Sequence, residues 1–168
     1  MVIDKQGRKK VDDEYGANYF IENFLGCSLV TSAKDETKTL INATEKWTRN
    51  NIIEDAAKAE KIRSTVRSIL EKEESVNIDN LSDEILESIE EKEHFSNFIK
   101  RHGLEDDVTI DKDYVEKKLK KVRIKIDRDI DLYIDYESYK DNSKFGIVKN
   151  GDGSINIVLK NIINYIEK

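Results

Sequence analysis

The sequence predicts an α+β protein in which about five helices are followed by a three- to four-stranded antiparallel β-meander. Two patterns predict this class. Up to about residue 119, apolar residues recur at intervals of three and four, which is the period of an amphipathic helix. Beyond that point they alternate with polar residues, which is the period of a half-buried strand. A chain in which helices come first and strands come last is typical of α+β proteins.

Two long amphipathic helices are predicted early in the chain, because each shows an apolar stripe at helical spacing. The first ends near residues 49–51, and the second covers about residues 55–72. The stripes are Leu40, Ala43, Thr44 and Trp47 in the first helix, and Ala59, Ile62, Val66, Ile69 and Leu70 in the second.

Three shorter helices are expected after a polar turn at residues 75–80. Ser82 is predicted to cap the first of them, since a serine oxygen accepts from free amides at a helix start. Phe95 lies in the next helix. Asp111 or Asp113 is predicted to begin the last, whose apolar residues lie four apart.

Strict alternation predicts the strands of the last third. Branched apolar residues at 122, 124 and 126, then at 130, 132 and 134, then at 155, 157 and 159, alternate with other residues. Asn150-Gly151-Asp152-Gly153 separates the last two predicted strands and is typical of a hairpin turn. Arg128-Asp129 is predicted to turn the preceding pair.

The chain of 168 residues has the length of one ordinary domain. Residues 1–17 are polar and contain two glycines, which predicts a flexible lead-in or a linker remnant. Residues 18–168 are expected to form a single α+β domain. Its helical part covers residues 18–110, and its mainly β part covers residues 111–168.

Composition excludes several classes of protein. A single cysteine, Cys27, excludes an intrachain disulfide, and with only His94 and His102 beside it a Cys/His zinc site is nearly excluded. No apolar run approaches the ~20 residues that a membrane span needs, and the start has no secretory signal. No nucleophile–base pair or phosphate-binding loop stands out. We therefore expect a cytosolic, non-catalytic protein without a metal or a cofactor.

One basic concentration stands out in a chain whose net charge is −6. Residues 117–128 carry seven cations against Asp127, a local net of +6. Such a patch can follow a phosphate backbone, and Tyr133 on the neighbouring predicted strand can add a stacking group. The alternative is a charged sheet face that blocks edge pairing and balances the acidic helices. The candidate DNA-binding residues are Lys117, Lys118, Lys120, Lys121, Arg123, Lys125 and Arg128.

Three stretches together resemble a known family. They are Tyr19–Cys27 (YFIENFLGC), Glu93–Gly103, and the terminal hairpin Phe145–Lys160. In this order and spacing they resemble the C-terminal half of the bacterial nucleoid-associated proteins of the 37-kilodalton (NdpA-like) family. The resemblance implies a non-catalytic protein of the bacterial cytoplasm and nucleoid, in which the full protein associates with DNA at low sequence specificity. It also implies that residues 2–17 end an interdomain segment.

A second function stays open beside DNA association. The chain can be a protein–protein or oligomerisation module that assembles or positions a separate DNA-binding half, with a second copy of itself as a partner. In that case the acidic stretch 71–93, whose local net charge is −8, meets a basic partner. The acidic overall balance favours this alternative, because compact DNA binders usually carry a basic surface.

Overall fold

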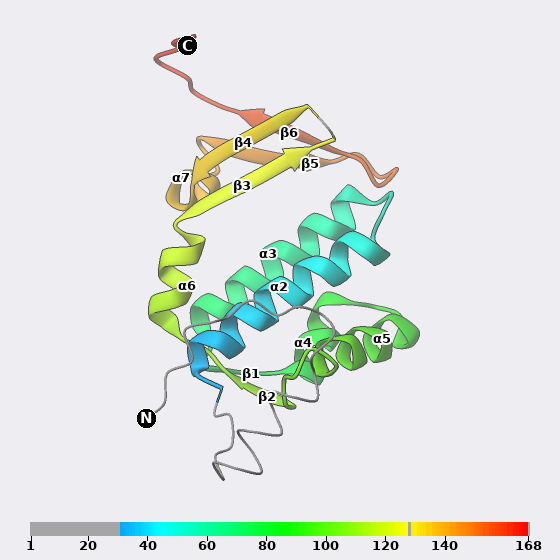
Figure 1. Ribbon diagram of the computed structural model, residues 1–168. Coiled ribbons are helices and arrows are strands. Elements are labelled where there is room, and N and C mark those ends of the chain that lie inside the picture. The colour runs from blue at the N-terminus through cyan, green and yellow to red at the C-terminus, as the bar shows by residue number, and fades with distance from the viewer. Residues whose placement is uncertain (1–30, 128, 168) are drawn as a thin grey trace, which may run out of the picture. The chain divides into compact units, whose positions relative to one another are not determined.

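The α+β class is confirmed by the structure, a computed structural model that describes residues 31–127 and 129–167 (Figure 1). Almost all of these residues belong to one compact unit, Ala33–Lys168. The predicted lead-in at residues 1–17, the Tyr19–Cys27 stretch and Arg128 lie outside the described residues.

The described helices are α2 (Ala33–Asn51), α3 (Ala56–Lys72), α4 (Ile78–Ile85), α5 (Ile89–Lys100), α6 (Lys112–Leu119) and α7 (Tyr136–Lys140). The strands are β1 (Ser75–Asn77), β2 (Asp107–Thr109), β3 (Lys121–Ile126), β4 (Ile130–Asp135), β5 (Phe145–Lys149) and β6 (Ile155–Leu159).

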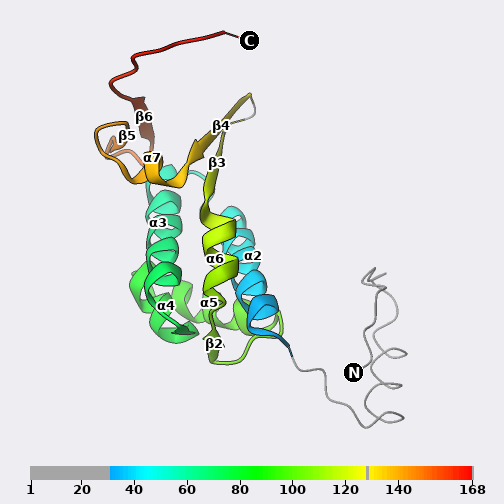
Figure 2. The ribbon, with the colours of Figure 1, turned by 90° about the vertical axis from the view of Figure 1, so that its left-hand side faces the viewer.

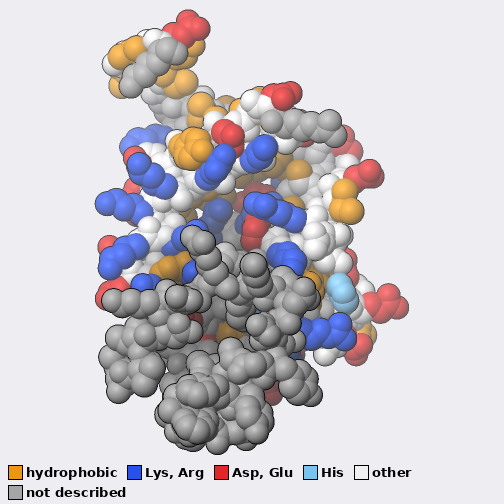
Figure 3. Space-filling view, viewed as in Figure 1, with side chains coloured by type: hydrophobic (Ala, Val, Ile, Leu, Met, Phe, Trp, Pro, Cys, Tyr) orange, Lys and Arg blue, Asp and Glu red, His pale blue; other side chains and the backbone are white. Residues whose placement is uncertain are grey.

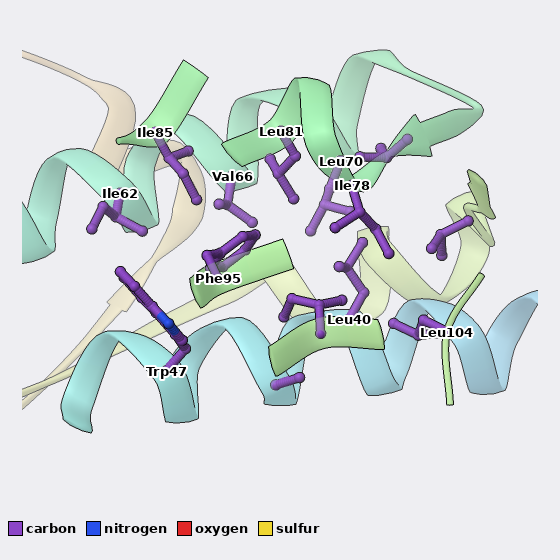
Figure 4. Packing of buried hydrophobic residues seen from close by; sticks show 14 of the residues in the cluster. Leu40, Trp47, Ile62, Val66, Leu70, Ile78, Leu81, Ile85, Phe95 and Leu104 are labelled. Carbon is purple, nitrogen blue, oxygen red and sulfur yellow. The ribbon is translucent and has the colours of Figure 1, made fainter. Parts of the chain in front are cut away.

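The helices enclose the hydrophobic core, and the apolar stripes predicted for the two long helices face it. Leu40 and Trp47 of α2 and Ile62 of α3 are fully buried, and Figure 4 shows them pointing into one cluster with residues of α4 and α5. The rings of Trp47 and Phe95 meet edge to face with centroids 5.3 Å apart. Trp47 Nε1 donates to His94 Nδ1 at 3.0 Å, which satisfies the indole nitrogen of a buried side chain.

Two predicted helix starts are confirmed by their capping bonds. The carboxylate of Asp55 accepts from the amide of Lys58 at 2.7 Å, and that of Asp111 accepts from the amide of Tyr114 at 2.8 Å. Each bond satisfies one of the free amides at a helix start.

The predicted cap at Ser82 is wrong. Helix α4 begins four residues earlier, at Ile78, and Asn77 caps it by accepting from the amides of residues 79 and 80. Ser82 lies inside the helix and donates to the carbonyl of Asp79. The polar turn expected at residues 75–80 is instead strand β1 and the first residues of α4, and β1 pairs with β2 in the register Val76↔Val108. That partner lies about thirty residues away, so local spacing could not indicate it.

The last third forms two separate hairpins rather than one meander. Strands β3 and β4 pair from Lys121↔Asp135 to Ile126↔Ile130, and β5 and β6 pair from Phe145↔Leu159 to Lys149↔Ile155. The predicted alternation and the turn at residues 150–153 are confirmed. The short helix α7 lies between β4 and β5, which do not pair, and Figure 2 shows the hairpins on either side of it.

Helix α7, which connects the two hairpins, attaches to the polar face of α3. Tyr139 of α7 donates to Glu60 at 3.3 Å and lies under the guanidinium of Arg67, 5.3 Å from its ring centroid. Lys140 pairs with Glu71 at 3.1 Å. Burial raises the pKa of Tyr139, with Glu60 adding to the rise. The tyrosine therefore stays a neutral donor in this joint.

Gly153 fixes the tip of the second hairpin to the start of α3. Its carbonyl accepts from the amide of Ala57 at 3.0 Å, and its φ of 89° lies in a region that favours glycine. A Cβ at this position would lie 3.2 Å from the carbonyl oxygen of Glu54. Both the conformation and the close approach therefore require glycine.

We expect Gly153→Ala to lower the free energy of unfolding by about 2–3 kcal/mol, because it adds a backbone contact to the conformational strain. Gly151→Ala is the matched control: its φ is 74°, yet nothing lies within 4 Å of an added Cβ. It should cost about 1 kcal/mol or less. Urea unfolding followed by the single tryptophan measures both variants. Equal losses would contradict the docking role of Gly153.

Candidate nucleic-acid interface

The sequence-predicted cations form one solvent-facing strip where α6 passes into β3. Lys117 and Lys118 lie in the last turn of α6, Lys120 is its C-cap, and Lys121 opens β3. All six predicted cations that the structure describes are exposed, and the seventh, Arg128, lies outside the described residues. Figure 3 shows Lys and Arg side chains along this side of the molecule, over α6 and β3. We call Lys117, Lys118, Lys120, Lys121, Arg123 and Lys125 the basic strip.

Local structure sets the direction of the strip. Val115 is buried against the core, so Lys117, two positions later, lies on the opposite side of α6. Lys118 is nearer to Val115 around the helix, but its side chain is exposed as well. In β3, Val122 is buried while Lys121, Arg123 and Lys125 lie on the opposite, outward face. Alternate residues of a strand lie about 6.6 Å apart, so these three cations span about 13 Å.

The partner strand neutralises part of this face. Lys121, Arg123 and Lys125 lie opposite Asp135, Tyr133 and Asp131 of β4. The guanidinium of Arg123 pairs diagonally with Asp131 at 3.2 Å, which raises the pKa of Arg123, and it also lies 5.1 Å from the ring centroid of Tyr133. Arg123 is thus held over an exposed aromatic ring instead of projecting freely into solvent.

The lysines of the strip are not neutralised in this way. Within the described chain, no carboxylate lies within 4.0 Å of the ammonium groups of Lys117, Lys118, Lys120, Lys121 or Lys125. An unpaired surface ammonium can exchange its counterions for phosphate contacts. The strip therefore offers its lysines, more than Arg123, to an anionic partner.

The acidic stretch 71–93 differs from the strip because much of it is paired internally. Five of its ten acids contact lysines at 2.7–3.3 Å. Two of the lysines come from α3, where Lys58 reaches Glu91 and Lys61 reaches Glu87. These pairs tie α5 and the segment before it to α3, and they leave less free charge for a basic partner than the sequence indicated.

A hollow of about 660 Å³ borders the strip between α6, α7 and the end of α3. Its lining includes apolar Val115 and Leu119 and the cations Lys112 and Lys120. Four carboxylates also line it, from Glu71, Glu116, Asp135 and Glu137. Four carboxylates against two lysines repel phosphate, so the hollow marks one boundary of the basic strip.

Lys112 is a positioning residue that the sequence pattern did not indicate. It is the first residue of α6, but its ammonium donates to the carbonyls of Leu70, Glu71 and Glu73, at 3.0, 3.0 and 2.5 Å. These carbonyls are at the C-terminal end of α3, where a cation is favoured. Lys112 thereby fixes the start of α6, and with it the direction of the strip.

His94 and His102, the two histidines of the chain, do not form a common site. Nδ1 of His94 accepts from Trp47, and Nδ1 of His102 lies 2.8 Å from the carbonyl oxygen of Phe98. Among the residues described, no group of three or more His, Cys, Asp and Glu side chains could hold a metal ion.

Fold and site together define an α+β protein with a basic strip on an otherwise acidic chain. None of its described helices is long and apolar enough to cross a membrane. A family model described as nucleoid-associated protein YejK matches residues 1–167. The chain therefore belongs to this family of nucleoid-associated proteins, which confirms the family resemblance of the three sequence stretches. Neither the curated proteins nor the solved structures contain a match.

We expect Lys112→Met to lower the free energy of unfolding by about 1–2 kcal/mol, because three carbonyl oxygens lose a charged donor. Lys118→Met, in the same helix but on the solvent side, should change it by less than about 0.5 kcal/mol. Thermal unfolding followed by circular dichroism compares the two variants. A tolerated Lys112→Met would show that the contacts at the end of α3 do not stabilise the fold.

Proposed function

We propose that this chain associates with duplex DNA at low sequence specificity, as a non-catalytic protein of the bacterial nucleoid and cytoplasm. The observation that carries the proposal is the basic strip, whose five lysines are exposed and have no carboxylate partner in the described part of the chain. Membership of the nucleoid-associated family supports the same partner.

The geometry favours contact with the DNA backbone over readout of the bases. A duplex presents one negative charge per ~1.7 Å of its axis, so a row of cations about 13 Å long faces several phosphates at once. Lysine ammoniums meet phosphates as point charges and carry no sequence information. Arg123 is held by Asp131, which leaves no free arginine in the described strip for paired contacts with guanine.

Exposed Tyr133 gives the strip one further group. Its side chain is 65% exposed and lies beside Arg123, on the same face as the strand lysines. The hydroxyl of such a ring can donate to a phosphate oxygen of the duplex, and its face can stack on a base where the strands separate. We propose it as an auxiliary contact, secondary to the lysines.

Fluorescence anisotropy of a labelled random duplex, at about 50 and 200 mM salt, tests the proposal. We expect Lys117, Lys118, Lys120 and Lys121, all changed to Ala, to weaken binding and to flatten the slope of log K against log salt by about 2–4. Each lost phosphate contact removes about 0.9 from that slope.

The control changes four exposed lysines elsewhere, at positions 34, 38, 46 and 72, to Ala. Both variants lower the net charge from −6 to −10, so a general electrostatic effect would weaken them equally. Loss confined to the strip variant supports the proposal. Equal losses in both variants, or no binding of the unchanged chain at low salt, would overturn it.

Asp131→Asn supplies a test by gain of binding. Removing the carboxylate frees Arg123 and adds one net positive charge to the face, so we expect tighter binding and a slope steeper by up to about 0.9. Asp83→Asn is the control, because it makes the same charge change in a surface ion pair of the helical part, where Asp83 contacts Lys92. Tighter binding by the control alone would place the interface elsewhere.

A further inference from the structure

Exposed apolar side chains of the described chain are concentrated near its C-terminal end. Of eleven large apolar side chains that are exposed in the described residues, six lie between Val158 and Ile166. Ile163 is 101% exposed and Tyr165 is 81% exposed. Scattered apolar residues are ordinary on a protein surface, whereas a contiguous run of them marks an interaction site.

The run is also nearly uncharged in a chain that is otherwise 38% charged. From Val158 to Ile166 its sequence is VLKNIINYI, in which Lys160 is the one charged residue. Isoleucine, valine and tyrosine favour strands, and a run with little charge and no proline is prone to strand association. Two copies can bring such runs together without the repulsion that their net charge of −6 creates elsewhere.

Beyond Asn161 the chain leaves its own hairpins. The amide of Lys160 donates to the carbonyl of Lys144 at 2.8 Å. The side-chain amide of Asn161 donates to the backbone carbonyl of Ser143 at 2.9 Å. At Asn161 the backbone turns, with a φ of 51°. Residues 162–167 then form neither helix nor strand, and Figures 1 and 2 show them leading away from the hairpins.

The hairpins themselves are incomplete. Each has two strands, so every strand has a free edge within the described chain, and two-stranded sheets are marginal without a further strand or a packed face. On the apolar face of β5–β6 only Phe145 is buried, while Leu159 opposite it is 52% exposed. No residue of either hairpin belongs to the main core cluster.

We propose that a second copy of this chain completes the β5–β6 hairpin, with residues 162–166 of each copy adding as a strand to the free edge of β6 in the other. Main-chain hydrogen bonds and the apolar side chains would both contribute to this pairing. The exchange is reciprocal, which is the arrangement that a two-fold dimer requires.

Charge distinguishes this hairpin from its neighbour. The outward face of β3 carries Lys121, Arg123 and Lys125, and charges of this kind oppose strand addition. The outward face of β5–β6 instead exposes Val148 and Val158. The proposed pairing surface is separate from the basic strip, so it does not rest on DNA association.

Sedimentation velocity of the full chain, without nucleic acid and over a hundredfold range of concentration, tests the proposal. We expect the mass to rise from 19.5 kDa to twice that value. Ile163→Asp combined with Ile166→Asp should weaken dimerisation at least tenfold. Both side chains are exposed in the single copy, at 101% and 71%, so the unfolding midpoint of the dilute protein should not change.

The matched control is Ile53→Asp combined with Ile89→Asp, which makes the same chemical change at isoleucines that are 78% and 73% exposed in the helical part. It should dimerise like the unchanged chain. Hydrogen exchange gives a second readout, since the amides of residues 155–167 should become more protected as concentration rises. A chain that stays monomeric throughout, or equal effects of both double variants, would overturn the proposal.

Discussion

Helix α3 must serve two environments at once, and the rest of the described structure depends on this constraint. One face carries Ala59, Ile62, Val66 and Leu70 into the core. The opposite face is polar: its Glu60 and Arg67 contact Tyr139 of α7, and its Glu71 pairs with Lys140 of α7. Both ends of α3 are also occupied, by Gly153 at its start and by Lys112 at its end. Helix α7 and the second hairpin are therefore attached to α3 by polar contacts, and neither hairpin contributes a residue to the main core cluster.

This attachment explains why the strip and the apolar segment can lie on one small chain. A basic strand face needs solvent, and the polar joint with α3 leaves the outward face of β3 open. The same joint leaves the apolar faces of the hairpins only partly covered, because none of their residues enters the core cluster. Surface ion pairs contribute little individually, so a further apolar contact at the hairpins would add stability that the polar joint does not supply.

The distribution of charge matters more than its sum. A net charge of −6 argues against a general DNA binder, yet five acids of the stretch 71–93 are already paired with lysines. The lysines of the strip, by contrast, have no such partners within the described residues. At physiological salt a charge acts over about 8 Å, so a partner at the strip meets its lysines and is screened from more distant acids.

Local patterns in the chain by themselves determined the α+β class, the two long helices, the helix starts near residues 55 and 111, and the turn at residues 150–153. These features depend on spacing, capping and turn chemistry within a few residues. Tertiary structure alone decided the pairing of β1 with β2, the start of α4 at Ile78, and the separation of the hairpins by α7. It also decided which charges are neutralised, since Arg123 meets Asp131 only through the strand register, and Lys112 meets the end of α3 across forty residues. Contacts between distant residues leave no periodic pattern in the chain, because their energy comes from packing and charge in three dimensions.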